Sequence, residues 1–186
     1  MREVRYADYA IGRFLEDAKN ESWFNDTIFV IVADHTAGAA GKTSLPPSRY
    51  HIPAMLYAPG LIKPQEINKL ASQIDLPVTL LSVLGFDYKS RFVGRDIMKN
   101  AFVERAFIAT FQKLGIYQNG TVTFVEPVKA YGLENELGTL EDKQKVASEA
   151  LLSVVTNYER ASLWKTNHRK LSSTLAERAQ ATSDIR

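Results

Sequence analysis

Apolar residues follow distinct patterns along the first part of the chain, and each pattern predicts an element. Residues 4–19 place apolar side chains close to helical spacing, with charged side chains on other faces, which predicts an amphipathic helix. Residues 27–33 are a continuous run of β-branched and aromatic side chains, which predicts a strand buried on both faces of a parallel sheet. Residues 52–58 are a second short apolar run, closed by Pro-Gly, and they predict a second strand.

A further apolar stretch, residues 76–84, predicts a short helix after the two strands. Asp75 precedes it and suits the N-cap position, while Pro77 lies in the first turn, where its missing N–H costs nothing. Gly85 follows as a helix stop. Strand, loop, strand, loop and helix therefore alternate up to this point, which is the pattern of a layered α/β sheet.

The second part of the chain has a different pattern. Residues 105–111 and 116–125 predict strands, and Asn119-Gly120 lies between alternating segments, which indicates a β-hairpin. Residues 140–170 have a helical pattern. The last dozen residues are polar and are expected to fray.

Composition narrows the class of protein. Among 186 residues, 45% are hydrophobic and 24% are charged, as in ordinary soluble globular domains. The net charge of +2 and the scattered basic residues do not indicate nucleic acid. The absence of cysteine excludes thiolate zinc sites, disulfides and cysteine nucleophiles. No apolar stretch is long enough to span a bilayer, so the chain itself is expected to be soluble.

Asp34 and His35 are the residues best placed for chemistry. They directly follow the predicted strand 27–33, and in open α/β sheets ligands bind beyond the carboxyl ends of strands. A carboxylate oxygen and an imidazole nitrogen suit Zn²⁺ or Mn²⁺, and the Gly- and Ala-rich residues 36–41 would let both side chains turn toward one ion. A structural role, with Asp34 capping a turn and His35 as a polar strand-end residue, is equally compatible with these residues alone.

His51 opens the second predicted strand after a loop that begins at His35, so the two histidines would flank one site. A structural histidine is the alternative. We expect His168 to be solvated in the polar tail, and Arg95-Asp96 to form a surface ion pair rather than an anion site. The sequence has no glycine-rich phosphate loop and no Gly-x-Ser-x-Gly elbow. Two ligands are also fewer than the three or so that a catalytic zinc site needs.

Four segments of the chain occur in an order and at spacings that are familiar from one enzyme family. They are residues 4–14, residues 29–35 ending in Ala-Asp-His, residues 50–60 with Tyr-His-Ile-Pro and Tyr-Ala-Pro-Gly, and residues 72–80 with Gln-Ile-Asp-Leu-Pro. Together they resemble the carboxyl-terminal half of the lipoteichoic-acid-synthase-like branch of the sulfatases, in the alkaline phosphatase superfamily. That branch includes phosphoglycerol transferases. The resemblance covers residues 1–100 well, and the remainder only as a generally similar hairpin and tail helix.

The resemblance implies an α/β fold, namely the carboxyl-terminal portion of an alkaline-phosphatase-like layered sheet with flanking helices, plus a β-hairpin and a carboxyl-terminal helix. Residues 1–100 would form half of the catalytic core, residues 101–135 a strand and hairpin extension of the same domain, and residues 136–186 a helix and polar tail. In the family, the first acidic ligand and the Thr or Ser nucleophile belong to the amino-terminal half. We therefore expect a truncated domain that is inactive by itself.

The resemblance also implies residue roles. Asp34 and His35 match the Asp-His pair that ligates the metal in the family, and His51 matches a further pocket histidine. The latter is suited to hydrogen-bonding a phosphate oxygen or protonating the leaving group. The expected cofactor is a divalent metal ion, Mn²⁺ or Zn²⁺, with Mg²⁺ or Ca²⁺ as alternatives.

The implied reaction is a double displacement. A Thr or Ser nucleophile, activated by the metal, attacks a phosphodiester, and the covalently held phosphoglycerol then passes to a sugar hydroxyl or to water. The expected function is therefore part of a phosphoglycerol transferase or hydrolase that acts on a phosphate or sulfate ester at the periplasmic face of the inner membrane. The alternative is a non-catalytic α/β interaction or oligomerisation module. Homo-oligomers through an exposed sheet edge fit either hypothesis.

Overall fold

The computed structural model describes residues 2–36, 44–127, 130–142, 146, 149–160 and 162–163. The chain divides into two compact units. The first unit is Met1–Thr36 with Ile52–Ile67, and the second is Ala37–His51 with Asn68–Arg186. The segment that joins the two strands of the first unit thus belongs to the second. Among the described residues, no helix is both long and apolar enough to cross a membrane.

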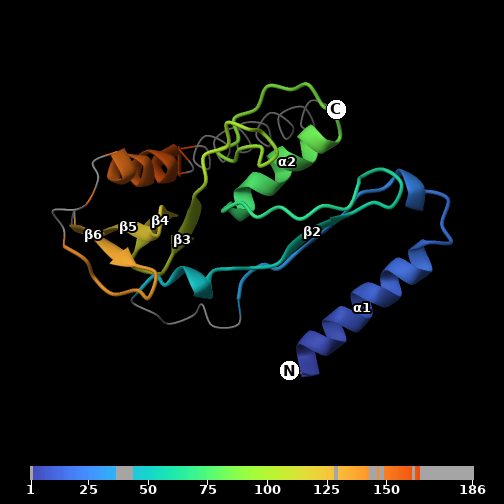
Figure 1. Ribbon diagram of the computed structural model, residues 1–186, viewed down its shortest axis with the longest axis horizontal. Coiled ribbons are helices and arrows are strands. Elements are labelled where there is room, and N and C mark those ends of the chain that lie inside the picture. Colours follow the sequence, from blue (N-terminus) through green and yellow to red (C-terminus); the bar gives the residue numbers. More distant parts are fainter. Residues whose placement is uncertain are drawn as a thin grey trace, which may run out of the picture. The chain divides into compact units, whose positions relative to one another are not determined.

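The first unit contains helix α1 (Arg2–Ala18), the 3-10 helix η1 (Phe24–Asp26) and strands β1 (Phe29–Val32) and β2 (Ala54–Tyr57) (Figure 1). These elements confirm the predicted helix and both predicted strands. An aromatic cluster fills the unit because rings from α1, η1, β1 and β2 meet around Phe29 at centroid distances of 5.5–6.2 Å. Such edge-on and tilted pairs add to the free energy gained from burial alone.

The prediction that strand 27–33 is buried on both faces of a parallel sheet is wrong. Strand β1 pairs with β2 in antiparallel register, from Phe29 opposite Tyr57 to Val32 opposite Ala54. Its residues alternate between half-buried and exposed, because successive side chains point to opposite faces and only the Phe29 face meets the aromatic cluster. Val30 and Val32, on the other face, remain 40% and 36% exposed.

Helix α1 carries an apolar stripe that is only partly covered. The stripe consists of residues at helical spacing along one face: Val4, Ala7, Ile11, Phe14, Leu15 and Ala18. Ala18, at its carboxyl-terminal end, is buried at 4% exposure, whereas Val4, Ile11 and Phe14 are 72%, 40% and 56% exposed. Within the described part of the first unit, the stripe therefore lacks cover toward its amino-terminal end.

The second unit is built on an antiparallel sheet of four strands in the order β3-β4-β5-β6. The strands are β3 (Ala106–Ala109), β4 (Leu114–Gln118), β5 (Thr121–Glu126) and β6 (Ala130–Asn135). Asn119-Gly120 connects β4 to β5 with φ angles of 52° and 77°, the left-handed conformation that a tight hairpin turn needs. The predicted hairpin is confirmed, while β6 was not predicted as a strand.

Both faces of this sheet are covered. The helix over residues 149–160 covers one face, where the Tyr158 ring packs edge-on against Phe107 at 5.9 Å. On the other face Leu45 is fully buried in a cluster with Ile108, Val122 and Phe124. Figure 1 shows the helix on one side of the sheet and the short helix η2 (Pro47–Arg49) on the other. The predicted tail helix is confirmed for residues 149–160, and His168 lies outside the described residues.

Candidate functional site

Asp34 and His35 lie just beyond the paired end of β1. The last backbone contact of the strand pair is the Ala33 amide, which donates to the Pro53 carbonyl at 3.2 Å. The two residues after Ala33 form a bend, so their side chains are released from the alternation of the strand. Residues 37–43, which include most of the predicted Gly- and Ala-rich stretch, lie outside the described residues.

The side chains of Asp34 and His35 turn toward each other. Asp34 Oδ1 accepts the backbone N–H of His35 at 2.9 Å, which fixes the carboxylate. His35 Nδ1 lies 3.0 Å from the Thr36 carbonyl oxygen. Because a carbonyl can only accept, Nδ1 carries a proton, and in the form of the ring that binds a metal the lone pair is on Nε2. His35 Nε2 then lies 3.4 Å from Asp34 Oδ2.

This arrangement fits two corners of a metal site. A tetrahedral ion with ligand bonds of about 2.0–2.1 Å holds its donor atoms roughly 3.3–3.4 Å apart. The nitrogen and oxygen here have that separation of 3.4 Å. A histidine that donates its second ring N–H to a backbone carbonyl is also the usual form of a metal ligand. An ion bound between them would remain accessible to further ligands, since the His35 side chain is 70% and the Asp34 side chain 87% exposed.

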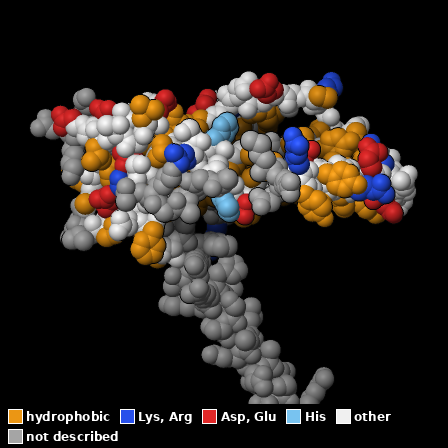
Figure 2. Space-filling model, turned by 90° about the horizontal axis from the view of Figure 1, so that it is seen from below, with side chains coloured by type: hydrophobic (Ala, Val, Ile, Leu, Met, Phe, Trp, Pro, Cys, Tyr) orange, Lys and Arg blue, Asp and Glu red, His pale blue; other side chains and the backbone are white. Residues whose placement is uncertain are grey.

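Of the predicted site residues, Asp34 and His35 lie together in the first unit, and His51 belongs to the second. Within the described residues, no group of three or more His, Cys, Asp or Glu side chains could hold a metal ion. His51 is an exposed residue of the second unit, between η2 and β2. Its convergence with the Asp-His pair stays a prediction. Figure 2 shows histidine side chains at the molecular surface.

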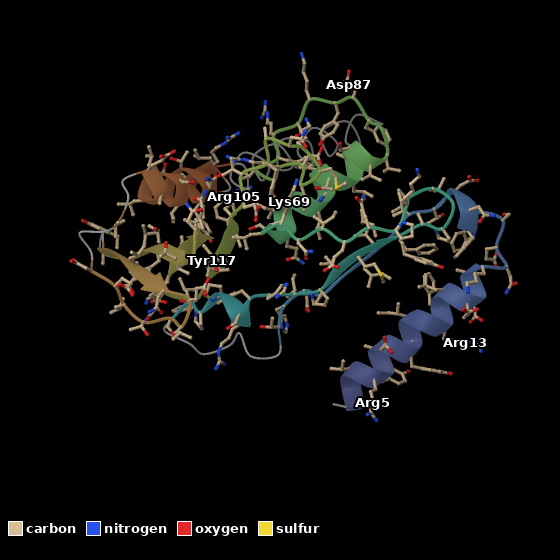
Figure 3. All side chains as sticks on the ribbon, viewed as in Figure 1. Arg5, Arg13, Lys69, Asp87, Arg105 and Tyr117 are labelled. Carbon is tan, nitrogen blue, oxygen red and sulfur yellow. The ribbon has the colours of Figure 1, made fainter. Side chains whose placement is uncertain are left out.

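Asp75 has a larger structural role than the predicted N-cap. Its side chain makes no capping bond to α2 (Leu76–Val83); it accepts the backbone N–H of Ser72 at 2.8 Å instead. Arg105, which lies just before β3 and is labelled in Figure 3, is the partner of this carboxylate. Its guanidinium donates to both oxygens, at 2.8 and 3.0 Å. Asp75 is fully buried and Arg105 nearly so. The pair therefore ties the start of α2 to the start of the sheet.

The predicted surface ion pair at Arg95-Asp96 is not formed within these two residues. Asp96 is buried at 7% exposure, and its Oδ1 accepts the backbone N–H of Met98 at 2.9 Å. The backbone N–H of Arg95 donates to Asp75 Oδ1 at 2.7 Å. Both residues thus shape the loop that leads to Arg105.

A second buried ion pair, Lys113 with Glu134, has no counterpart in the sequence prediction. Glu134 on β6 is fully buried, and its Oε1 accepts from Lys113 Nζ, which also lies 4.2 Å from the centre of the Phe124 ring. Glu126 Oε1 lies 3.6 Å from the same ammonium group. An isolated Glu in a short strand gives no sequence signal, because its partner is 21 residues away.

Two tyrosines beside β3 have raised pKa values. The Tyr158 hydroxyl donates to the Ile108 carbonyl at 3.4 Å, and burial, with a smaller effect from Tyr50, raises the pKa of Tyr158 to about 12. Tyr50 donates to the Ala109 carbonyl at 3.1 Å, and burial followed by the negative charge of Glu134 raises its pKa. Both phenols are thus neutral hydrogen-bond donors at neutral pH.

Comparison with known proteins supports the resemblance to the sulfatases that the sequence indicates. Residues 1–86 match the sulfatase family model. A protein of the alkaline phosphatase superfamily from Vibrio parahaemolyticus has a similar structure, with a TM-score of 0.76 and 30% identity, and the match covers 88% of this chain and 41% of that one. Two Bacillus subtilis proteins, lipoteichoic acid synthase-like YvgJ and lipoteichoic acid synthase 2, are each 26% identical over 112 residues. These matches cover 51–52% of this chain and 17–18% of the relatives.

The mixed α/β fold and these similarities define a member of the alkaline phosphatase superfamily. Within it, residues 1–86 match the sulfatase family model, and the resemblance of the chain to the lipoteichoic-acid-synthase-like branch is confirmed. Homologues in this family are enzymes, and members of the superfamily act on sulfate or phosphate esters and typically use divalent metal ions. The chain spans less than half of the Vibrio chain and about a fifth of the Bacillus relatives.

Proposed function

We propose that this chain supplies part of the metal centre of a sulfatase-family enzyme, with Asp34 and His35 as two of the ligands. The observation that carries the proposal is the 3.4 Å approach of Asp34 Oδ2 and His35 Nε2, with the imidazole proton held on the opposite nitrogen. A divalent ion bound there would supply Lewis-acid stabilisation of negative charge. The chain's own residues hold the donor atoms at the right spacing and leave them accessible.

The remaining parts of the site would come from other polypeptide of the same fold. Two protein ligands are fewer than a catalytic metal site requires. The chain covers 41% of the Vibrio structure, which leaves room in that fold for a further acidic ligand and a Thr or Ser nucleophile. The uncovered part of the α1 stripe, including Val4 and Ile11, offers apolar surface for such a segment. By itself, the chain is then inactive.

The substrate class follows from the family. The superfamily acts on sulfate or phosphate esters, and the similarity to lipoteichoic acid synthase 2 favours phosphoglycerol transfer from a phosphodiester. His51 would hydrogen-bond a phosphate oxygen or protonate the leaving group, since its side chain is exposed and accessible to a substrate. We place the whole enzyme at the extracytoplasmic face of the membrane on the same similarity.

A non-catalytic interaction module is the alternative function. The uncovered α1 stripe favours it, because an exposed apolar face is typical of a surface that binds another protein. Under this alternative, the contact between Asp34 and a protonated His35 is a surface ion pair, which has the same distance. Metal binding therefore distinguishes the two functions.

Calorimetric titration with Zn²⁺ and Mn²⁺ tests the proposal on the chain itself. We expect Asp34→Ala and His35→Ala each to weaken Zn²⁺ binding at least about tenfold, because losing even a hydrogen-bond partner of a ligand costs about 10–100-fold in affinity. Asp87→Ala, which removes an exposed carboxylate elsewhere, is the matched control and should bind like the wild type. Mn²⁺ should also broaden the NMR resonances of the His35 ring first. Equal affinities in all four proteins would contradict the metal site.

The origin of the nucleophile has its own test. The coding sequence on the 5′ side of the Met1 codon should continue in frame into a segment with a Thr or Ser nucleophile. A stop codon there, with no companion gene for such a segment, would contradict the proposal that the chain acts as part of a larger enzyme.

A further inference from the structure

The segment 44–50, which lies between His35 and His51 in sequence, is part of the core of the second unit. Leu45 is fully buried against Ile108, Val122 and Phe124. The sheet leaves space for it: a Cβ at Gly115 would lie 2.9 Å from Leu45 Cδ1. Gly138, at φ +80°, brings the end of β6 close to Ser44, since a Cβ there would lie 3.1 Å from Ser44 Cβ. Segment 44–50 has the composition of a loop, but through Leu45 it packs against the sheet as part of the core.

Glu134 attaches this segment to the sheet. Its Oε2 accepts the backbone N–H of Leu45 at 2.7 Å, across 89 residues of sequence, while its Oε1 accepts from Lys113. The carboxylate is fully buried, so its charge requires the ammonium group beside it. An apolar pair of similar volume would pack here without the desolvation cost of two ions. The buried pair contributes something that an apolar pair cannot, namely an acceptor fixed in place for the Leu45 amide.

The other end of the segment is attached independently. The Tyr50 hydroxyl donates to the Ala109 carbonyl at 3.1 Å, and the Tyr50 amide donates to the Pro47 carbonyl at 2.9 Å. Pro46 and Pro47 restrict φ between the two attachments. His51 follows Tyr50 directly, so its main chain starts from a position that the sheet determines.

We propose that Glu134 is a positioning residue for His51. It fixes segment 44–50 on the sheet through the Leu45 amide, and the fixed segment sets where the His51 side chain begins. The role of His51 toward a phosphate ester rests on the proposed function, whereas the attachment of the segment does not. Glu134 touches neither substrate nor metal in this proposal; it acts through the main chain from Leu45 to Tyr50, which is attached to the sheet at both ends.

Hydrogen exchange on the purified chain, followed amide by amide, tests the proposal. The main variant is the double substitution Lys113→Met with Glu134→Leu, which removes both charges together and leaves neither ion buried alone. We expect the hydrogen-bonded amides of the segment, those of Leu45, Arg49 and Tyr50, to exchange roughly tenfold or more faster, because the local opening free energy of the segment falls. Amides of β4 and β5 should stay protected, which shows that the sheet is intact.

Two single variants make the test specific. Glu134→Gln keeps an oxygen that accepts the Leu45 N–H, and Glu126, 3.6 Å from Lys113 Nζ, leaves that ammonium group a carboxylate partner. This variant should therefore retain most of the protection at these amides. Glu136→Gln, two residues further along and exposed, should leave it unchanged. Unchanged exchange of these amides in the double variant would overturn the proposal. Zn²⁺ affinity, measured on the same proteins, reports on Asp34 and His35 and not on segment 44–50. A wild-type chain that does not bind Zn²⁺ would overturn the proposed function and leave the exchange result unaffected.

Discussion

The two units of the chain differ in how completely they bury their apolar and charged side chains. The first unit has a two-stranded ribbon, an apolar stripe that is mostly exposed and an Asp-His pair at the surface. The second has a four-stranded sheet covered on both faces and two ion pairs, Asp75 with Arg105 and Lys113 with Glu134, that are taken out of water. The unit that carries the candidate metal ligands thus buries few apolar side chains, whereas the second unit has most of the buried core and also buries charged groups in pairs, although Phe111 and Leu137 remain exposed there.

This difference separates two sources of stability. Buried ion pairs stabilise a fold only as long as both partners are present, so the second unit should be sensitive to single charge deletions. The first unit buries few side chains within its own described residues, so polar substitutions on its exposed stripe should cost little.

The largest expected effect is at Arg105. Arg105→Met leaves the Asp75 carboxylate buried without its cation, and the free energy of unfolding should fall by about 3–5 kcal/mol. Urea unfolding measures this change. The control Arg91→Met removes an exposed guanidinium from the preceding loop and should have little effect. The double variant Asp75→Asn with Arg105→Met should recover part of the loss, and a single variant as stable as the wild type would show that the pair does not hold the second unit.

A smaller effect is expected from Tyr158 at alkaline pH. Its pKa is raised to about 12, above the value of about 10 in the unfolded chain, because burial disfavours the phenolate. The stabilisation is therefore complete below pH ~10 and is lost as pH rises toward ~12, by roughly 2 kcal/mol.

Urea midpoints between pH 8 and pH 11 measure about the first half of this loss. Tyr158→Phe should lose most of the pH dependence, and the exposed Tyr6→Phe should retain it. An identical slope in Tyr158→Phe would assign the alkaline destabilisation to other groups, Tyr50 first among them because its pKa is also raised.

The smallest effect is expected on the α1 stripe. Val4→Gln with Ile11→Gln should change the free energy of unfolding by less than about 0.5 kcal/mol, because both side chains are exposed. Self-association, measured by sedimentation, should decrease in this variant. Ala18→Gln, at the buried end of the same stripe, is the control and should destabilise the chain. A clear loss of stability from the first variant would mean that the stripe is covered by the chain itself.

Local patterns predicted the elements that depend on neighbouring residues. Helical spacing gave α1, the apolar runs gave β1 and β2, and Asn119-Gly120 gave the hairpin between β4 and β5. The position of the Asp-His pair at the end of β1 also followed from the sequence, because a strand end needs only local information. The family resemblance, not the spacing, supplied its expected role as a metal site.

The features of the fold that the sequence did not predict depend on contacts between residues far apart in the chain. A continuous apolar run fits a strand with two buried faces, but β1 has one packed face and an antiparallel partner. Segment 44–50 is a loop with one 3-10 turn, as its prolines indicate, but no local pattern predicts that Leu45 lies in the core. Strand β6 contains Gly132 and the buried Glu134, which interrupt its apolar pattern. Glycine is required there because a Cβ would lie 2.6 Å from the Phe124 ring.

The placement of segment 44–50 also constrains how the chain can be divided. The polypeptide passes from the first unit to the second after Thr36, returns after His51 and leaves again after Ile67. A protease that cuts once within 37–43 would leave each fragment with residues of both units, so the products should remain associated under native conditions. For the same reason, any contiguous stretch of the gene that encodes the whole unit carrying Asp34 and His35 also encodes residues 37–51 of the second unit.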